Sequence, residues 1–241
     1  MMNIKSKKIL PKGQKERTDF PRFGMPHYAH YVPTMNADYS IQLGGDVASR
    51  IVGPQDLHAL ERVELTADFH CVTTWSYCDV QWSGFRFKDF YKQFVQPLLP
   101  ESDEMLIATF AGLDRYRSTL FLQDALADEI LLVDQMNGQP LSGDHGAPLR
   151  LVAPAHYGYK SVKHLSKINV WRTIQEDKRG IRKMMEHPRG RAAFEERGQF
   201  FPGWLLRYIY RPMIKRTIRQ FIDASQRKTT QDMQNLAELQ K

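Results

Sequence analysis

The segment Asp68-Phe69-His70-Cys71-Val72-Thr73-Thr74-Trp75-Ser76 contains one of the two cysteines of this 241-residue chain. It is followed by Asp79 and by Trp82-Ser83-Gly84-Phe85. A strand that ends in a cysteine and continues into threonine and serine places one soft sulfur beside several hydroxyl and backbone donors. This arrangement suits a thiolate-bound metal with anionic ligands, because soft sulfur favours thiophilic metals and the donors stabilise negative charge.

Cys71 also has a simpler interpretation, as a small buried hydrophobic residue, which is the commonest fate of a free cysteine. For Cys78 we keep that interpretation. The spacing of seven between the two cysteines fits neither a zinc pair nor a redox Cys-x-x-Cys motif. Two cysteines are also too few for a disulfide framework, so Cys71 remains the only candidate metal ligand of this type.

A second segment, residues 137–164, combines a turn rich in Gly and Pro, a short strand bearing Arg150, and a loop at Gly158 that carries Lys160 and Lys163. Three cations near one loop form a local anion site, and a glycine lets the backbone approach a phosphate closely. Taken singly, each charge is better explained as a solvated group or a member of a surface ion pair.

Together the two segments resemble the sulfite oxidase-like molybdopterin-binding oxidoreductases. The first matches as Asp-Phe-His-Cys-Val-Thr-x-Trp-Ser, and the second as His-Gly-Ala-Pro-x-Arg-Leu-Val-x-Pro followed by Tyr-Gly-x-Lys-Ser-x-Lys. The resemblance extends over residues 23–171 and implies an α+β, sulfite oxidase-type domain of mixed sheets and short helices. It makes Cys71 the single protein ligand of molybdenum, with Thr73, Thr74 and Trp75 shaping the approach of the substrate.

The resemblance also implies which residues bind the molybdenum-molybdopterin cofactor. His145 stands where the protein-methionine-sulfoxide reductases of the superfamily usually have asparagine. His27 lies in a loop that resembles the family's N-terminal cofactor loop, although a lone histidine is more often structural. The full predicted set is His27, Cys71, Ala111, Gly112, His145, Arg150, Lys160, Ser161, Val162 and Lys163.

The activity implied is oxygen-atom transfer between a small oxo substrate and the cofactor, with electrons exchanged with an external partner. The sequence has neither a haem Cys-x-x-Cys-His motif nor an iron-sulfur cysteine set, so that partner is another molecule. Thr74 replaces an arginine that many relatives carry, which weakens an assignment to sulfite. The alternative is a non-catalytic scaffold that keeps the fold and binds a protein through basic C-terminal helices.

The formal charge of +7 and the pI of about 9.4 do not describe the predicted domain. Residues 1–22 hold seven basic and two acidic residues, and residues 172–222 hold thirteen and five. Residues 23–171 hold eleven basic and seventeen acidic residues, a net charge of −6. Because the body is acidic, we expect no nucleic-acid partner.

We divide the chain into a flexible basic arm (1–22), the molybdopterin-binding domain (23–171), a basic helical extension (172–224) and a polar tail (225–241). In residues 200–222, aromatic and basic residues alternate at helical spacing, which predicts packing on the chain's own domain. Docking to an acidic protein or a membrane surface is the alternative. With neither a secretory nor a twin-arginine signal visible, we expect a cytoplasmic protein.

Hydrophobic periodicity and turn residues predict the main elements of the body. Strands are expected at 39–43, 63–65, 105–110 and 150–152. Short helices are expected at 54–60, 87–95 and 122–126.

Overall fold

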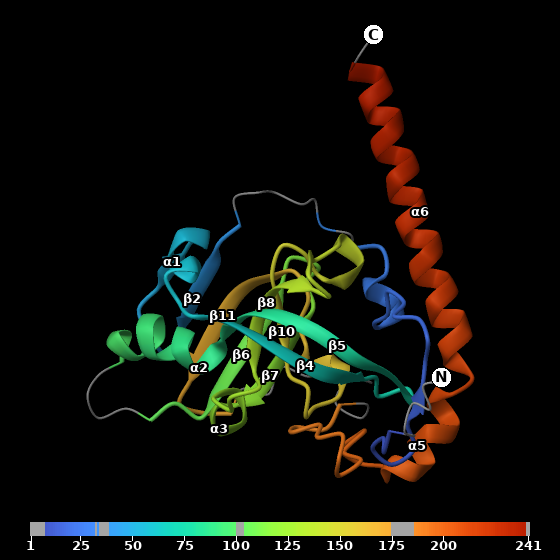
Figure 1. The fold of residues 1–241 in the computed structure, drawn as a ribbon, viewed down its shortest axis with the longest axis horizontal. Helices are drawn as coiled ribbons and strands as arrows, with labels where there is room; N and C mark the ends of the chain where they lie inside the picture. The colour runs from blue at the N-terminus through green and yellow to red at the C-terminus, as the bar shows by residue number, and fades with distance from the viewer. Residues whose placement is uncertain (1–7, 32, 34–38, 100–103, 175–185, 240–241) are drawn as a thin grey trace, which may run out of the picture.

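The computed structural model describes residues 8–31, 33, 39–99, 104–174 and 186–239. They form two β-sheets with short helices at the edges and a long C-terminal helix beside them (Figure 1). The first sheet contains β1 (Lys15–Glu16), β4 (Arg62–His70), β5 (Trp75–Arg86), β8 (Leu131–Met136), β9 (Gln139–Pro140) and β10 (Arg150–Val152). The second contains β2 (Ile41–Gly45), β3 (Arg50–Val52), β6 (Ile107–Gly112), β7 (Arg117–Phe121) and β11 (Leu165–Trp171).

The main hydrophobic core combines residues of both sheets. Phe85 and Leu132 of the first sheet belong to the same buried cluster as Phe110 and Ile168 of the second. Phe87 and Phe90 of α2 (Phe87–Phe90) also belong to it, and α2 continues into η2 (Tyr91–Val95) and η3 (Gln96–Leu98). Burial of these side chains is the main favourable free energy that holds the sheets together.

The first sheet is buried on its second face as well. Val133 of β8 and Trp82 of β5 belong to a smaller cluster, against which Phe20 of the N-terminal segment packs. Alternate residues of a strand point to opposite faces, so Leu132 reaches the main core while Val133 reaches this one. A strand covered on both faces gives the continuous apolar run Leu131-Leu132-Val133.

Residues 8–22 differ from the expected flexible arm. Strand β1 pairs in parallel with β5, and Lys15 is opposite Trp75. The backbone N–H of Arg17 donates to the Ser76 carbonyl at 2.8 Å. A charged sequence without an apolar periodicity gave no sign of this pairing, which depends on the partner strand. Residues 1–7 of the arm lie outside the described residues.

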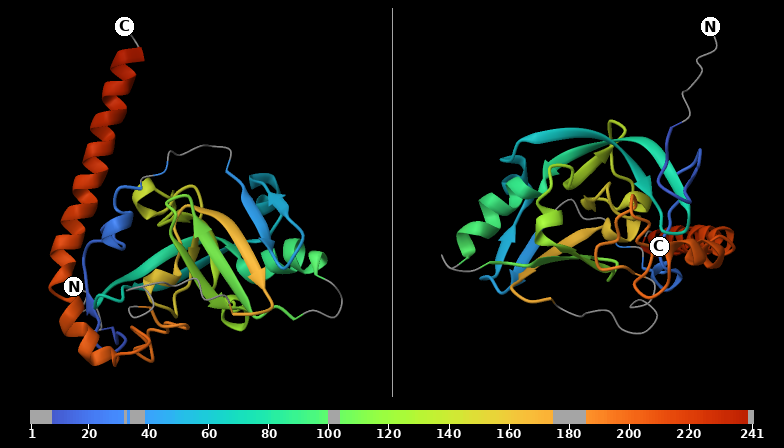
Figure 2. Two further views of the ribbon diagram at one scale, coloured as in Figure 1. Left: turned by 180° about the vertical axis from the view of Figure 1, so that it is seen from behind. Right: turned by 90° about the horizontal axis from the view of Figure 1, so that it is seen from below.

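The C-terminal region also differs in detail from the expected extension. After residues 186–202, which are mostly turns and bends, come α5 (Gly203–Tyr210) and α6 (Met213–Leu239). Helix α6 continues through the expected polar tail and runs past the body of the molecule (Figure 2). No helix among the described residues is long and apolar enough to cross a membrane.

The expected α+β architecture is confirmed, and most expected elements exist. The helix at 54–60 is α1 (Pro54–His58), the one at 122–126 is α3 (Leu122–Ala125), and the strand at 150–152 coincides with β10. The other described strands were not anticipated as elements: β1, β3, β5, β7, β8, β9 and β11. The other short helical turns among the described residues are η1 (Pro26–Tyr28), η4 (Gly143–His145) and η5 (Gly158–Lys160).

Candidate active site

Cys71 lies in the tight turn that joins β4 to β5. The N–H of Cys71 donates to the Trp75 carbonyl at 2.8 Å, and the N–H of Thr74 donates to the Cys71 carbonyl at 3.2 Å. Thr74 has a φ of 82°, a left-handed conformation that is uncommon for a residue with a β-branched side chain. Held in this turn, the Cys71 side chain is only 6% exposed, and its Sγ lies 3.1 Å from the Thr73 Oγ1.

Two distant segments hold the turn in place. Gln14 Nε2 donates to the Cys71 carbonyl at 3.0 Å, and the N–H of Lys15 donates to the Thr74 carbonyl at 3.0 Å. From the other side, Arg197 donates to the Val72 carbonyl at 2.5 Å and to the Lys12 carbonyl at 3.1 Å. Arg197 is fully buried, so it anchors the residue next to Cys71 without contact with solvent.

The thiol of Cys71 is protonated at neutral pH in this environment. Burial raises its pKa to about 11, while the contact with Thr73 and the charges of Arg197 and Lys163 oppose that rise. A thiol of this kind is a poor nucleophile. A thiophilic cation displaces the proton on binding, so the site suits a structural thiolate ligand better than nucleophilic catalysis.

Aromatic rings surround the region next to the turn. Phe20 has ring-centroid distances of 4.9 Å to Phe69, 6.1 Å to Trp75 and 4.7 Å to His145. The Phe20 ring also lies 6.3 Å from Trp82. The N-terminal segment, the β4–β5 hairpin and η4 therefore meet at one place.

Several buried polar atoms at this place have no hydrogen-bond partner among the described residues. They are Nε1 of Trp75, Nε1 of Trp82, Nδ1 of His145, and Nε and Nη2 of Arg150. Buried polar groups are nearly always bonded, because an unmet donor costs roughly 1–3 kcal/mol. Such a concentration of unmet groups fits a large ligand rich in acceptor atoms, as a molybdopterin is.

Arg150 is the clearest member of this set. Its side chain is fully buried, and only Nη1 has a hydrogen bond, to the His145 carbonyl at 2.9 Å. The guanidinium lies 5.8 Å from the Phe69 ring and 5.2 Å from the Trp82 ring. Burial lowers its pKa to about 10, which leaves it charged at neutral pH with no carboxylate partner among the described residues. It therefore offers a fork of donors to an anion.

His145 and Lys163 add to this electropositive region. Burial, together with the charges of Lys163 and Arg150, lowers the pKa of His145 to about 4, so its imidazole is neutral. Burial and the charges of Arg150 and Arg22 lower the pKa of Lys163 to about 7. Its Nζ donates to the Asp144 carbonyl at 2.5 Å. The charges of Arg150 and Arg22 therefore disfavour the protonated form of Lys163, and a bound anion would relieve that repulsion.

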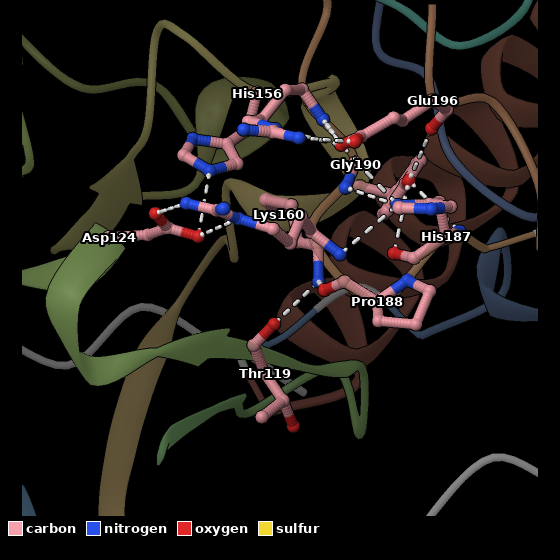
Figure 3. Close-up of polar contacts among 11 residues, drawn as sticks. Thr119, Asp124, His156, Lys160, His187, Pro188, Gly190 and Glu196 are labelled. Carbon is pink, nitrogen blue, oxygen red and sulfur yellow. Dashed lines mark hydrogen bonds and ion pairs between the residues drawn. The ribbon is translucent and has the colours of Figure 1, made fainter. Parts of the chain in front are cut away.

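Lys160 has a different environment, although it lies in the same predicted segment. Its fully buried amine donates to the Thr119 and Pro188 carbonyls, each at 2.5 Å (Figure 3). Beside it, Arg189 forms a bidentate ion pair with Asp124. Lys160 thus joins β7 to the segment before α5, and its amine is directed there. The structure does not bring it to Cys71.

Most of the remaining predicted cofactor residues have side chains that are small or are used in the fold, so they could offer a cofactor mainly their backbone groups. Ser161 Oγ accepts from the N–H of Ala153 at 3.1 Å, and the Val162 side chain lies in the main core. Ala111 and Gly112 end β6, and a Cβ on Gly112 would be 2.2 Å from the Lys163 carbonyl oxygen. His27 is exposed in η1, with its ring 4.1 Å from Tyr28. The structure gives it no contact with the Cys71 turn.

Gly158 has another role than the one expected for a glycine near a phosphate. A Cβ on Gly158 would be 2.2 Å from the Phe69 ring, so a side chain of β4 covers this glycine. The predicted loop is thereby packed against the strand that leads into Cys71.

Comparison with known proteins identifies the fold. Residues 29–178 match the sequence profile described as "Oxidoreductase molybdopterin binding domain". The chain belongs to this family. The resemblance inferred from the two motifs is therefore confirmed.

Characterised and uncharacterised relatives agree with this membership. The "Uncharacterized oxidoreductase YuiH" of Bacillus subtilis (strain 168) is 32% identical over 160 residues, 66% of this chain and 77% of the relative. The mitochondrial sulfite oxidase of Drosophila melanogaster is 27% identical, over 58% of this chain and 28% of its own length. The catalytic subunit MsrP of the protein-methionine-sulfoxide reductase of Pseudomonas syringae pv. tomato is 32% identical, over 55% of this chain and 47% of its own.

A solved structure has the same fold. The sulfane dehydrogenase SoxCD of Paracoccus pantotrophus superposes on 67% of this chain and 46% of its own, with a TM-score of 0.54 and 17% identity. The matched region thus spans most of the Bacillus relative but less than half of the sulfite oxidase and reductase chains.

Several residues of the site were missed from the sequence, among them Gln14 and Lys15, which hold the Cys71 turn. Phe20 was assigned to the arm, and Arg197 lies beyond both the motifs and the matched residues 29–178. Their roles depend on contacts between segments distant in sequence, for which no local pattern exists. A surface hollow lined by Lys88, Tyr91 and Leu122 lies on the α2 side and contains none of the predicted site residues.

Proposed function

We propose that this protein is a molybdenum-molybdopterin oxidoreductase that catalyses oxygen-atom transfer. One observation carries the proposal: a buried cysteine closely follows Phe69, whose ring lies 5.8 Å from a buried guanidinium with two nitrogens unpartnered among the described residues. Family membership supplies the class of cofactor. When bound, this cofactor provides the two-electron redox chemistry and the exchangeable oxygen, while the protein provides orientation and electrostatics.

Cys71 would be the protein ligand of molybdenum. Its turn is anchored by Gln14, Lys15 and Arg197, so the sulfur has little freedom to move. A ligand fixed before binding loses little entropy when the metal arrives. The charges of Arg197 and Lys163 favour the thiolate over the thiol and thus favour metal binding.

Arg150, Lys163 and the neutral imidazole of His145 would bind the pterin and its phosphate. Arg150 gives two directed donors. Lys163 gives a compact ammonium group whose pKa of about 7 lets it gain or lose its proton near neutral pH. Close packing of Gly112 against the Lys163 carbonyl brings two backbone segments together beside these side chains. The segments are Ala111–Gly112 and Ser161–Val162. We keep His27 and Lys160 in the proposed set at the lowest rank, since neither contacts the Cys71 turn.

The substrate side of the site would be formed by the turn itself. Thr73 Oγ1 lies beside the Cys71 sulfur, and the Trp75 ring is buried among the surrounding aromatic rings. Thr74 provides no positive charge, which favours a neutral oxo substrate such as a sulfoxide or an N-oxide over an oxyanion. The direction of transfer and the external electron partner are separate questions for assays with purified redox partners.

The test measures cofactor content rather than turnover. The chain is produced in a host that makes molybdopterin, and molybdenum per chain is measured by plasma mass spectrometry, with released pterin measured by fluorescence. We expect about one molybdenum per wild-type chain. Cys71→Ala should lose at least about 90% of the metal, since single second-sphere changes alone cost 10-fold to 100-fold in metal affinity.

Cys78→Ala is the matched control and should keep the metal. Wild-type protein without metal or pterin, from a host that loads a control enzyme, would contradict the proposal and favour the scaffold alternative. A loaded protein justifies assays with sulfoxides, N-oxides and sulfite. The cytoplasmic location stays a prediction, tested by fractionating the native host.

A further inference from the structure

A second surface of the molecule is unusual in both its apolar and its charged residues. Six large apolar side chains around α5 are between 38% and 68% exposed: Phe200, Phe201, Trp204, Tyr208, Ile209 and Met213. A soluble surface normally leaves such residues scattered singly, whereas a continuous group marks an interaction site. Trp204 and Tyr208 are one helical turn apart and lie on the same side of α5.

Basic residues border this group. Arg211, Lys215, Arg216 and Arg219 are exposed at the end of α5 and along the first turns of α6, with no ion pair to another described residue. Residues 200–222 contain no Asp or Glu at all. Arg207, by contrast, is bound to Glu195 by two hydrogen bonds. The surface is therefore aromatic in its centre and positive along one side.

The opposite side of the same helices packs on the body, as expected from the sequence. Leu206 and Tyr210 of α5 are buried, and Phe221 and Ala224 of α6 form a cluster with Ala29. Packing thus uses one side of the helical stripe and leaves the other exposed. Figure 1 shows α5 at an extremity of the molecule, where a flat surface could approach it without meeting the sheets.

We propose that the surface formed by residues 200–219 docks on an anionic lipid bilayer. Trp and Tyr rings are enriched at the membrane interface, because their apolar bodies enter the headgroup region while their polar tips stay hydrated. Each Lys or Arg near an anionic surface strengthens binding by about fivefold. A protruding corner with aromatic residues and cations, and with no Asp or Glu within residues 200–219, meets both requirements.

The corner adjoins the candidate active site. Arg197, which holds the Val72 carbonyl, lies three residues before Phe200. Arg197 also pairs with Glu195, which binds Arg207 of α5. The docking proposal does not depend on the proposed function, since it concerns a different set of residues.

The experiment is vesicle flotation of the full chain. Phosphatidylcholine vesicles and vesicles with 30% phosphatidylglycerol are compared at about 0.1 M and 0.5 M NaCl. We expect binding to the anionic vesicles, weakened by salt, and a blue shift of the Trp204 fluorescence that is absent in Trp204→Phe. Lys215→Glu/Arg216→Glu should lower the partition coefficient by at least about 30-fold.

Trp204→Ser/Tyr208→Ser tests the apolar part and should weaken binding in the same way. The charge control is Lys92→Glu/Lys167→Glu, and the apolar control is Ile51→Ser/Leu113→Ser, with all four residues outside the C-terminal helices. Circular dichroism establishes that each variant is folded. Equal loss in the controls, or absence of binding to the anionic vesicles, would overturn the proposal. Binding to polyglutamate but not to the vesicles would overturn it in favour of an acidic protein partner.

Discussion

Arg150 and Lys160 are ten residues apart, are both fully buried and are both cationic, yet their surroundings differ. Lys160 donates to two carbonyls that belong to β7 and to the segment before α5. Arg150 makes one hydrogen bond and has two nitrogens without a partner among the described residues.

This difference separates a structural cation from one prepared for a ligand. When all the donors of a buried cation are hydrogen-bonded to the chain, the cation connects parts of the fold. Its removal leaves the accepting carbonyls without hydrogen bonds. A buried charge with unused donors costs folding free energy until a ligand is bound. The two residues therefore make opposite predictions about stability and cofactor binding.

The largest expected effect on cofactor binding concerns Arg150→Met. Pterin retained after gel filtration should fall at least about tenfold, because two charge-assisted hydrogen bonds are lost. The free energy of unfolding of the cofactor-free chain should change by less than about 1 kcal/mol, since an incompletely bonded buried charge is removed as well. Both quantities are measured on the same preparation. Arg150→Lys keeps the charge but not the two directed donors, and it should restore little pterin binding. If Arg150→Met were destabilised and kept its pterin, Arg150 would be a structural cation like Lys160.

Lys160→Met should show the reverse pattern. The free energy of unfolding of the cofactor-free chain should fall by about 3 kcal/mol, because two buried carbonyls lose a charged donor. Urea denaturation followed by circular dichroism measures this loss. Chains that remain folded should keep their pterin. If Lys160→Met instead lost pterin with unchanged stability, Lys160 would belong with the cofactor residues.

The smallest expected effect is the pH dependence contributed by Lys163. Its pKa is about 7 in the folded chain, against an ordinary value of 10.5 for lysine, so the unfolded state binds more protons between these limits. Stability of the cofactor-free chain should therefore rise with pH across this window. From pH 7 to 9 we expect wild type to gain about 1 to 2 kcal/mol relative to Lys163→Met. His145, His156 and His164, with pKa values of about 4, do not titrate there.

Urea titrations at pH 7, 8 and 9 check this slope. Parallel pH profiles for the two proteins would show that Lys163 is hydrated and that folding does not lower its pKa. A steeper profile for Lys163→Met would reverse the sign of the argument.

The sequence was most informative where one residue type has few possible roles. The motif around Cys71 and the order of Gly, Pro and Arg around Arg150 predicted the family, the α+β fold and the likeness of two segments to a cofactor site. Short strands such as β10 were found because apolar residues between turn signals have few alternatives. Strand β5 was not among the expected strands, although it carries several residues of the first motif.

The tertiary structure decided which of the chemically similar residues face each other. Sequence spacing placed Lys160 and Lys163 in one anion site, but the three-residue turn η5 directs the Lys160 amine toward Thr119 and Pro188. It also brought Phe20 and Arg197 to the Cys71 region from segments assigned to an arm and an extension. Local patterns encode periodicity and turns, whereas contacts between distant segments depend on the packing of the whole chain, so only the folded molecule shows them.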